Sequence, residues 1–562
     1  MHLLSMALLL RHLGLMLVML AFLMPGHYLP WASFQSQWVA GLGTALVVIS
    51  AARVAGQAGR GITVPPLAIL MLGYAAIPAL QWICGQLHFA SDAVLASAYF
   101  VALGLAMIGG RACTENRRDD WLNNFFAALI AAAGVSVALA LAQWLSLDVS
   151  QVWVSVAPPG ARPFANLAQP NHLALLLTLG VVGTIRARIR QALGGATASL
   201  LLMWLGLGLV MTQSRTGWLM AALLVLWCGH PWFRLHGLSL GKVVLAASIF
   251  VAAVLSWDGL NDALQLSHVN TLGERMQAGP RSLIWQTMIE AIARAPWFGY
   301  GFNQITLAQQ AVATEIEPVH RMLESAHNIV LDAALWAGAP FALTLVLAVG
   351  AWLVLRVRDC RSLDDWSVLA AIGAILTHAM FEFPLEHAYF LLPLGLLIGS
   401  FPQASIAVPQ RVIAWPLALS VLAMTVLLFV IGGEYLRVEQ ANRQVRLALF
   451  GVGDPAGAGA APPDVRLLDA PREYHRLMQT RAREGMSTDE LDWMQRVTRR
   501  HAFPPAMLRY ALAAALNGRE AEAELTLRQL CAMHTPLRCE ESRDAWKAAQ
   551  KRWPALAGIS AP

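Results

Sequence analysis

Long apolar runs alternate with short polar segments over about the first 430 residues of the chain. Many of these runs approach or reach the roughly 20 residues that an α-helix needs to cross a lipid bilayer. The pattern predicts about thirteen spans, at residues 6–24, 38–52, 63–82, 92–109, 121–145, 170–185, 196–213, 216–229, 241–257, 327–355, 366–382, 387–402 and 411–432. We therefore expect an all-α, polytopic membrane protein.

Composition and charge support this expectation and add an orientation. Of 562 residues, 57% are hydrophobic and 13% are charged, whereas a soluble domain carries about 25% charged residues. The net charge of +6 gathers in short loops on one side of the predicted spans. Those loops carry Arg53, Arg60, Arg111, Arg117, Arg118, Arg186, Arg188, Arg190, Arg234, Lys242, Arg356, Arg358 and Arg361. By the positive-inside rule these loops are cytoplasmic. This predicts a cytoplasmic N-terminus, a periplasmic loop at 258–326 and a periplasmic C-terminus in a bacterial inner membrane. Because the basic residues follow this pattern, they do not indicate nucleic-acid binding.

The composition changes after residue 432, which predicts two domains, a membrane domain at 1–432 and a helical periplasmic domain at 433–562. A Gly/Ala/Pro-rich stretch at 451–463 is typical of a linker. The segment 510–530 predicts two amphipathic helices with a turn at Asn517-Gly518, similar to one tetratricopeptide hairpin. Cys531 and Cys539 have a spacing that could close a disulfide or leave two free thiols.

The first group of candidate site residues lies where an outer loop enters the span at 170–185. Arg162 precedes Gln169, Asn171 and His172, with a proline at position 170. Proline suits the first turn of a helix, and free N–H groups at a helix N-terminus beside an arginine favour an anionic phosphate. The alternative is an ordinary helix start whose amides are satisfied locally.

Arg215 belongs to a second group, the tight polar turn 212–217 between two spans. Its guanidinium at the outer membrane boundary could form paired hydrogen bonds to a diphosphate. The alternative is an arginine that extends its side chain to the lipid headgroups.

The long loop and the span after it hold the next candidates. Arg281 lies near the start of an amphipathic helix that also carries Trp285, whereas Arg275 and Arg321 are weaker candidates for an anion site. His327 opens the span at 327–355 and is followed by Asn328. Histidine is the commonest general base, although a lone histidine at a helix start is often a cap or a packed polar residue.

The last candidates lie between the spans at 366–382 and 387–402. This short segment offers carboxylates at Glu382 and Glu386, an imidazole at His387 and a phenol at Tyr389. It is either part of the site or a short polar hairpin. The chain has no HExxH, CxxC pair, Walker A, dinucleotide-binding glycine pattern or nucleophile elbow. We therefore expect neither a metal nor a nucleotide cofactor, and a donor that is already activated.

At these residues the chain resembles the Wzy/WaaL superfamily of O-antigen polymerases and ligases, and more closely the PglL-type O-oligosaccharyltransferases, which implies a GT-C-like fold. The resemblance is carried by Ala168-Gln169-Pro170-Asn171-His172-Leu173-Ala174, Ser214-Arg215-Thr216-Gly217, Arg281 with Trp285, and His327-Asn328 with Leu331 and Gly338. It covers roughly residues 150–400, and a long loop before the histidine-bearing span fits the same layout.

The resemblance implies a role for each residue. His327 would be the base that activates the acceptor, and Arg215 and Arg281 would hold the diphosphate. Gln169 would be a functional amide, and Tyr389 would match a functional tyrosine. The implied donor is an undecaprenyl-diphosphate-linked oligosaccharide, and the implied acceptor is a serine or threonine of a pilin or another exported protein.

Two other functions stay open. An O-antigen ligase or polymerase would use the same donor with a saccharide acceptor. A membrane transporter would place polar residues near the middle of its spans and would show repeat symmetry between its halves. Here the polar residues gather at the outer ends of the spans, and we find no repeat.

Overall fold

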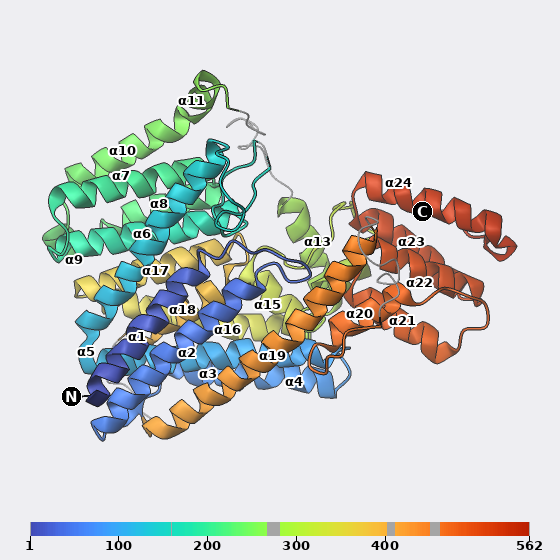
Figure 1. Ribbon diagram of the computed structural model, residues 1–562, viewed down its shortest axis with the longest axis horizontal. Helices are drawn as coiled ribbons and strands as arrows, with labels where there is room; N and C mark the ends of the chain where they lie inside the picture. Colours follow the sequence, from blue (N-terminus) through green and yellow to red (C-terminus); the bar gives the residue numbers. More distant parts are fainter. Residues whose placement is uncertain (1, 159, 267–280, 402–410, 450–460, 561–562) are drawn as a thin grey trace. The chain divides into compact units, whose positions relative to one another are not determined.

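The computed structural model describes the whole chain except residues 1, 159, 267–280, 402–410, 450–460 and 561–562. Two predicted features lie outside the described residues. One is the candidate Arg275 with its neighbours Glu274, Met276, Gly279 and Pro280, and the other is most of the predicted linker 451–463. The regular secondary structure of the described part is helical apart from one two-residue antiparallel pair, β1 (Ile62–Thr63) with β2 (Arg411–Val412). The all-α prediction is therefore confirmed at the level of the fold class (Figure 1).

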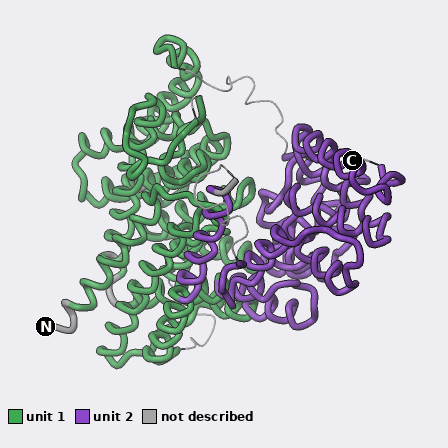
Figure 2. The backbone as a smooth tube through the Cα atoms, turned by 45° about the vertical axis from the view of Figure 1, so that its right-hand side comes forward, with its two compact units in different colours: residues 1–74, 99–277, 347–429 green, residues 75–98, 278–346, 430–562 purple. Residues whose placement is uncertain are grey.

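The chain forms two compact units, coloured separately in Figure 2, and each is described by itself. The first comprises residues 1–74, 99–277 and 347–429, and the second comprises 75–98, 278–346 and 430–562. Three helices contain a boundary between the units: α5 (Ala90–Trp144), α16 (Ala339–Arg358) and α19 (Ala414–Leu449). The other helices of the first unit are α1 (His2–Ala21), α2 (Phe34–Gln57), α3 (Pro66–Tyr74), α6 (Pro170–Ile189), α7 (Gly195–Thr212), α8 (Arg215–Trp227), α9 (Pro231–His236), α10 (Leu240–Leu255), α11 (Trp257–Ala263), α17 (Leu363–Ala379), η1 (Pro384–Glu386) and α18 (Ala388–Gly399).

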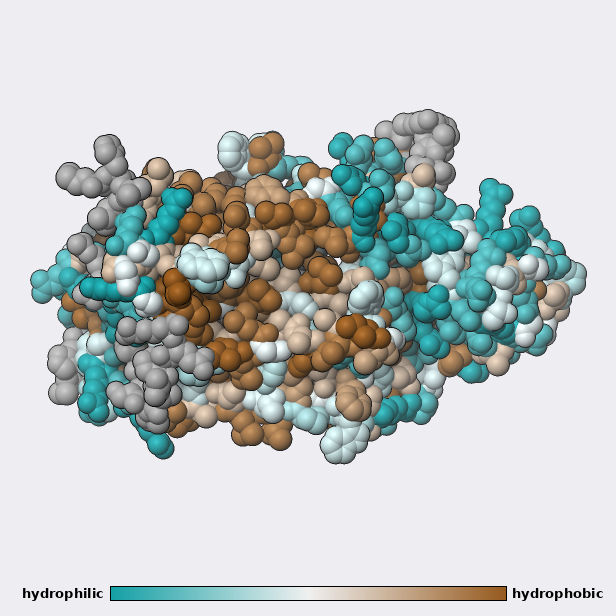
Figure 3. All heavy atoms as spheres, turned by 90° about the horizontal axis from the view of Figure 1, so that it is seen from below, coloured by the Kyte–Doolittle hydropathy of each residue, from teal (hydrophilic) through white to brown (hydrophobic). Residues whose placement is uncertain are grey.

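Within the described residues, 8 helices are long and apolar enough to cross a membrane, or up to 9 if the bent pair α10–α11 is one span. Three shorter apolar helices, Met6–Ala21, α8 and α18, overlap further predicted spans. Every predicted span overlaps at least one helix, and Figure 3 shows a broad hydrophobic area on the face that it displays. The chain is a multi-pass membrane protein.

Two predicted boundaries are wrong. The segment 110–120, expected to be a loop between two spans, is helical, and α5 runs through it without interruption. Two of its arginines form ion pairs: Arg111 bonds Glu115 one turn further on, and Arg118 bonds Asp365 at 2.6 Å. The predicted span 327–355 is divided at Gly338, where a φ of 89° separates two helices.

The second unit contains two earlier segments, 75–98 and 278–346, and the C-terminal helices. It contains α4 (Ala76–Ile83), α13 (Arg281–Arg294), α14 (Ile305–Val312), α15 (Ile329–Ala337), α20 (Asp469–Gln479), α21 (Thr488–Arg500), α22 (Pro504–Leu516), α23 (Glu520–Met533), α24 (Pro536–Arg552) and η3 (Pro554–Leu556). Helices α22 and α23 confirm the predicted hairpin, with Gly518 at a φ of 79° in the turn. Leucine, methionine, alanine and aromatic side chains from α20 to η3 form one core.

Ionic contacts tie the C-terminal helices to the start of α5. Asp469 accepts the backbone N–H groups of Ala90 and Ser91 at 3.0 and 2.8 Å, so that a residue distant in sequence caps this helix. Arg500 donates two hydrogen bonds of 2.9 Å to the buried carboxylate of Asp92. A paired arrangement of this kind is geometrically specific.

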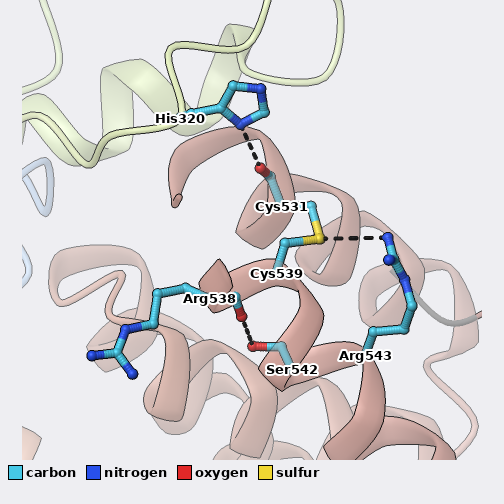
Figure 4. The surroundings of a disulfide bond; sticks show 6 residues. All are labelled: His320, Cys531, Arg538, Cys539, Ser542 and Arg543. Carbon is cyan, nitrogen blue, oxygen red and sulfur yellow. Dashed lines mark hydrogen bonds between the residues drawn. A yellow bond between two sulfur atoms is a disulfide. The ribbon is translucent and has the colours of Figure 1, made fainter. Parts of the chain in front are cut away.

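The C-terminal helices also support the long loop. Gln310 donates to the carbonyl of Arg499 at 2.8 Å, and the backbone N–H of His320 donates to that of Ala532 at 3.1 Å. Cys531 and Cys539 form a disulfide beside this contact (Figure 4). The ring of His320 lies 3.3 Å from the Cys531 carbonyl oxygen. The loop before His327 therefore rests on helices from the end of the chain.

Candidate functional site

His327 lies in a sharp turn immediately before α15. Its φ of 54° is in the left-handed region, which costs a residue other than glycine roughly 1–2 kcal/mol. Asp332, buried on the first turns of α15, closes the turn: its two carboxylate oxygens accept the N–H of Ala326 at 2.6 Å and the hydroxyl of Ser325 at 2.9 Å. Ser325 in turn accepts the N–H of His327 at 3.0 Å. The imidazole is thus carried by a braced backbone, and its side chain is half-buried.

Asn328, predicted from the sequence as a site residue, is the N-cap of α15. Its side-chain oxygen accepts the N–H groups of Val330 and Leu331 at 2.9 and 3.2 Å. Burial raises the pKa of the nearby Asp332 carboxyl to about 6, although the hydrogen bonds from Ala326 and Ser325 act in the opposite direction. The geometry therefore gives Asn328 a local structural task beside His327.

Helix α13 packs against the same turn. The indole N–H of Trp285 donates to the carbonyl of Ala326 at 3.1 Å, directly before His327. Arg281 begins α13 and lies four residues before Trp285. Side chains four residues apart lie on one face of a helix, about 5–6 Å between their Cβ atoms. Arg281 is therefore on the face of α13 that meets the His327 turn.

The first unit holds a buried polar network around Glu382, which is 3% exposed. Its two carboxylate oxygens accept the side-chain amides of Gln169 at 3.0 Å and Asn171 at 2.7 Å. The hydroxyl of Ser214 donates to the Asn171 carbonyl at 2.7 Å. Three segments that are distant in sequence therefore meet in this network.

The same network fixes the start of α8. Ser214 caps this helix by accepting the N–H of Gly217 at 3.0 Å, and Arg215 is the first helical residue. Gln213 precedes them with a φ of 46°, and Arg162 donates to its carbonyl at 3.2 Å. Both predicted arginines of the first unit thus lie at one helix N-terminus, where the helix dipole favours an anion.

Aromatic rings enclose the network beside Glu382. The ring of His172 lies 4.7 Å from that of His387, which stacks on Tyr389 at 5.1 Å. Tyr389 is only 2% exposed and packs on Phe22. In this structure its ring is part of the core.

The predicted residues fall into two groups. Arg162, Gln169, Asn171, His172, Arg215 and Tyr389 gather in the first unit, and Arg281, His327 and Asn328 gather in the second. The sequence named Glu382 as one of the carboxylates between two predicted spans but gave it no specific role, and Asp332 was not named. A signal for Asp332 existed, because it is an acidic residue within the predicted span 327–355. Among the described residues, no group of three or more His, Cys, Asp or Glu side chains could hold a metal ion.

The protein has many apolar helices, and the arginines of the candidate site and the braced histidine lie outside the candidate spans. Comparison with known proteins indicates that it is a membrane glycosyltransferase. Residues 198–346 match the family model described as O-Antigen ligase, and residues 366–551 match one described as Virulence factor membrane-bound polymerase, C-terminal. Over residues 198–346 the chain is thus similar to the O-antigen ligase family. The predicted resemblance is thereby confirmed.

Two relatives from Acinetobacter baylyi narrow the comparison. The chain is 29% identical to the General O-oligosaccharyltransferase over 431 residues, which cover 73% of each protein. It is 24% identical to the ComP-specific O-oligosaccharyltransferase over 322 residues, which cover 57% of this chain and 58% of the relative. Both matched relatives are thus named for the transfer of oligosaccharides to oxygen.

Proposed function

We propose that the protein transfers a preassembled oligosaccharide from an undecaprenyl-diphosphate carrier to serine or threonine hydroxyls of exported proteins, such as a pilin. The observation that carries this proposal is the His327 turn, in which Asp332, Ser325 and Trp285 hold a half-buried imidazole beside the arginine-bearing face of α13. The names of the two relatives favour this reaction.

In the proposed reaction, His327 takes the proton of the acceptor hydroxyl as a general base. The acceptor oxygen then attacks the anomeric carbon of the glycan while the bond from that carbon to the diphosphate oxygen breaks. The electron pair leaves with the carrier diphosphate, and a single displacement inverts the anomeric carbon. Arg215 and Arg281 would neutralise the charge that grows on the diphosphate.

The polar network of the first unit would serve the donor. Arg215 begins α8 at an N-terminus that favours anions, and Arg162 contacts the preceding residue. Gln169 and Asn171 direct their NH2 groups to Glu382, which leaves the carbonyl oxygen of Gln169 as an acceptor for a sugar hydroxyl. His172 and Tyr389 would line the same region. This chemistry needs no metal ion or other cofactor, because the diphosphate is itself a good leaving group.

We place the site and the C-terminus on the periplasmic side of the inner membrane. The arginine distribution favours this orientation, and the Cys531–Cys539 disulfide supports it, because disulfides persist in oxidising compartments. About thirteen spans, with α8 and α18 counted as short ones, fit the same orientation. In this proposal the membrane domain ends at about residue 432, and its long loop at 258–326 is periplasmic.

A second candidate function is that of an O-antigen ligase or polymerase with a saccharide acceptor. It is favoured by the descriptions of the two matching family models. The same donor site and the same base would serve it, so that only the acceptor distinguishes the two functions.

The test is transfer in vitro with the purified full-length protein. Lipid-diphosphate-linked oligosaccharide is mixed with a pilin-like protein or with lipid A-core, in the presence of EDTA. We expect glycan on the protein with the wild type and none with His327→Ala. His320→Ala is the matched control, because this exposed histidine of the same loop also has a left-handed φ of 52°. Transfer to lipid A-core alone would establish the second candidate, and full activity of His327→Ala would remove the proposed base.

A further inference from the structure

Two adjacent aromatic side chains project from the loop between α13 and α14. Trp297 is 70% exposed and Phe298 is 77% exposed. Large aromatic groups are rarely left in water by chance when they are this exposed and adjacent, and they commonly mark an interaction surface. The catalytic proposal makes no use of this pair.

The loop is held firmly where two candidate spans end. The N–H of Ala339, which starts the span Ala339–Arg358, donates to the carbonyl of Pro296 at 2.7 Å. Gln86, just after the span Pro66–Ile83, donates to the carbonyls of Phe298 and Gly299 at 3.0 Å each. The aromatic pair therefore lies at the membrane boundary of both spans.

Glycines make this close seating possible. A Cβ atom at Gly338 would lie 2.2 Å from the carbonyl oxygen of Trp297, and one at Gly299 would lie 2.4 Å from that of Leu335. Both glycines also have positive φ values, of 89° and 65°. The backbone that carries the two rings is therefore fixed by close packing, and the loop conformation keeps both rings exposed.

Exposed apolar side chains continue from the loop onto the two spans. At the end of α4, Trp82 is 48% and Ile83 is 71% exposed, and on α16 Leu343 is 58% exposed. Aromatic rings at the ends of spans sit at the level of the lipid headgroups. We propose that Trp297 and Phe298 insert into the headgroup region of the bilayer and anchor the second unit to the membrane surface.

The anchor would set the height of the histidine above the bilayer. The loop joins α15 directly, through Tyr300 N–H to Leu335 at 2.6 Å, and joins α13 through the Tyr300 hydroxyl to Ala291 at 3.0 Å. Both helices hold the His327 turn. A membrane-bound diphosphate donor lies at the headgroup level, so the anchor would keep the base at the height of the scissile bond. This last consequence rests on the proposed function, whereas the anchor itself does not.

The test measures the depth of the loop in a membrane. The full-length Cys84→Ser protein, which keeps the disulfide and the buried cysteines Cys113, Cys228 and Cys360, receives a nitroxide at Phe298→Cys. It is reconstituted in nanodiscs of phosphatidylethanolamine and phosphatidylglycerol. We expect collisions with lipid-soluble oxygen to exceed those with a water-soluble nickel chelate several-fold. The matched control is a nitroxide at Gln286→Cys, an exposed position of α13, where the ratio should be reversed.

A label at position 298 that the nickel chelate reaches as readily as the control would overturn the anchor. Hydroxyl-radical footprinting of the unmodified protein in the same nanodiscs gives a second measure, free of any effect on folding. We expect Trp297 to be protected there, and oxidation at the level of a fully hydrated tryptophan would also overturn the proposal. Glycan transfer by the wild-type protein is assayed in parallel. A label that lies deep in the bilayer, together with no glycan transfer by the wild type, contradicts only the proposed function. A water-exposed label together with normal glycan transfer contradicts only the anchor.

Discussion

Asp332→Asn should separate the positioning of His327 from its chemistry. The substitution keeps the size of the side chain but replaces one acceptor oxygen with an NH2 group and removes the charge. Asparagine can still accept the N–H of Ala326, but its NH2 then faces Ser325, whose hydroxyl loses its acceptor. Because Ser325 also accepts the N–H of His327, the change passes directly to the histidine.

The magnitude follows from the opposing contributions at this turn. The left-handed φ of His327 costs roughly 1–2 kcal/mol, and a hydrogen bond to a charged group contributes about 1.5–3 kcal/mol. Loss of one such bond therefore removes about as much energy as the strain requires, and the turn should relax. A loss of about 2 kcal/mol corresponds to an approximately 30-fold fall in kcat. KM for the lipid donor should change little, since the side-chain hydrogen bonds of Asp332 go to Ser325 and Ala326 in the His327 turn.

Initial rates of glycan transfer at saturating donor measure this effect, with Asp544→Asn on exposed α24 as the matched control. A pH series adds an independent check. Burial raises the pKa of Asp332 to about 6, so the wild-type carboxyl becomes protonated below that pH and resembles the amide. The ratio of wild-type to variant rates should shrink as the pH falls through 6. A ratio that does not change with pH, or a variant with full activity and unchanged melting temperature, would refute the reasoning.

Three further results are expected. Glu382→Gln sets an NH2 group against an amide donor, so the free energy of unfolding should fall by about 1.5–3 kcal/mol and the lipid donor should bind more weakly; unaltered donor titrations would contradict this. Replacing Cys531 and Cys539 by serine opens a loop with a sequence separation of 8, which should lower the free energy of unfolding by roughly 2.5 kcal/mol. Calorimetry should show this difference between wild type and variant without reductant and no difference with reductant. Burial holds the pKa of His501 well below 6.5, so in mild acid this histidine takes up a proton only in the unfolded chain. One pH unit below 6.5, the free energy of unfolding of the second unit should therefore be lower by about 1.4 kcal/mol. His501→Gln should remove that part of the pH dependence.

The hydrophobic pattern was sufficient to predict the helices because each span must satisfy its own backbone in lipid. It could not predict that α5 continues through residues 110–120, since helicity there accompanies ion pairs such as Arg118 with Asp365. The break at Gly338 was equally hidden, because an isolated glycine within an apolar run is usually tolerated in a helix. Local sequence identifies elements, whereas partners distant in sequence decide where they end.

The candidate site shows the same division. Motifs identified His327, Arg215 and Gln169, because these residue types at the ends of spans are costly unless they serve a purpose. The hydrogen bonds that Glu382 and Asp332 make could not be predicted, because a hydrogen-bond partner cannot be inferred without the fold; Glu382 was named only as a nearby carboxylate, and Asp332 was not named. The disulfide was left open for a similar reason, since spacing alone does not fix the distance between two cysteines.

The composition of the second unit has a consequence for how the protein is made. Its members come from residues 75–98, 278–346 and 430–562, and Asp469 completes the start of α5, which is synthesised far earlier. Domains fold in order as the chain emerges from the ribosome, but this unit must wait for its last helices. Until α21 and α23 have been synthesised, the loop that leads to His327 lacks the hydrogen bonds that these helices give it. Under the proposed function, a nascent chain would therefore be inserted in the membrane yet unable to consume the lipid-linked donor, and completion of synthesis would act as the activating step.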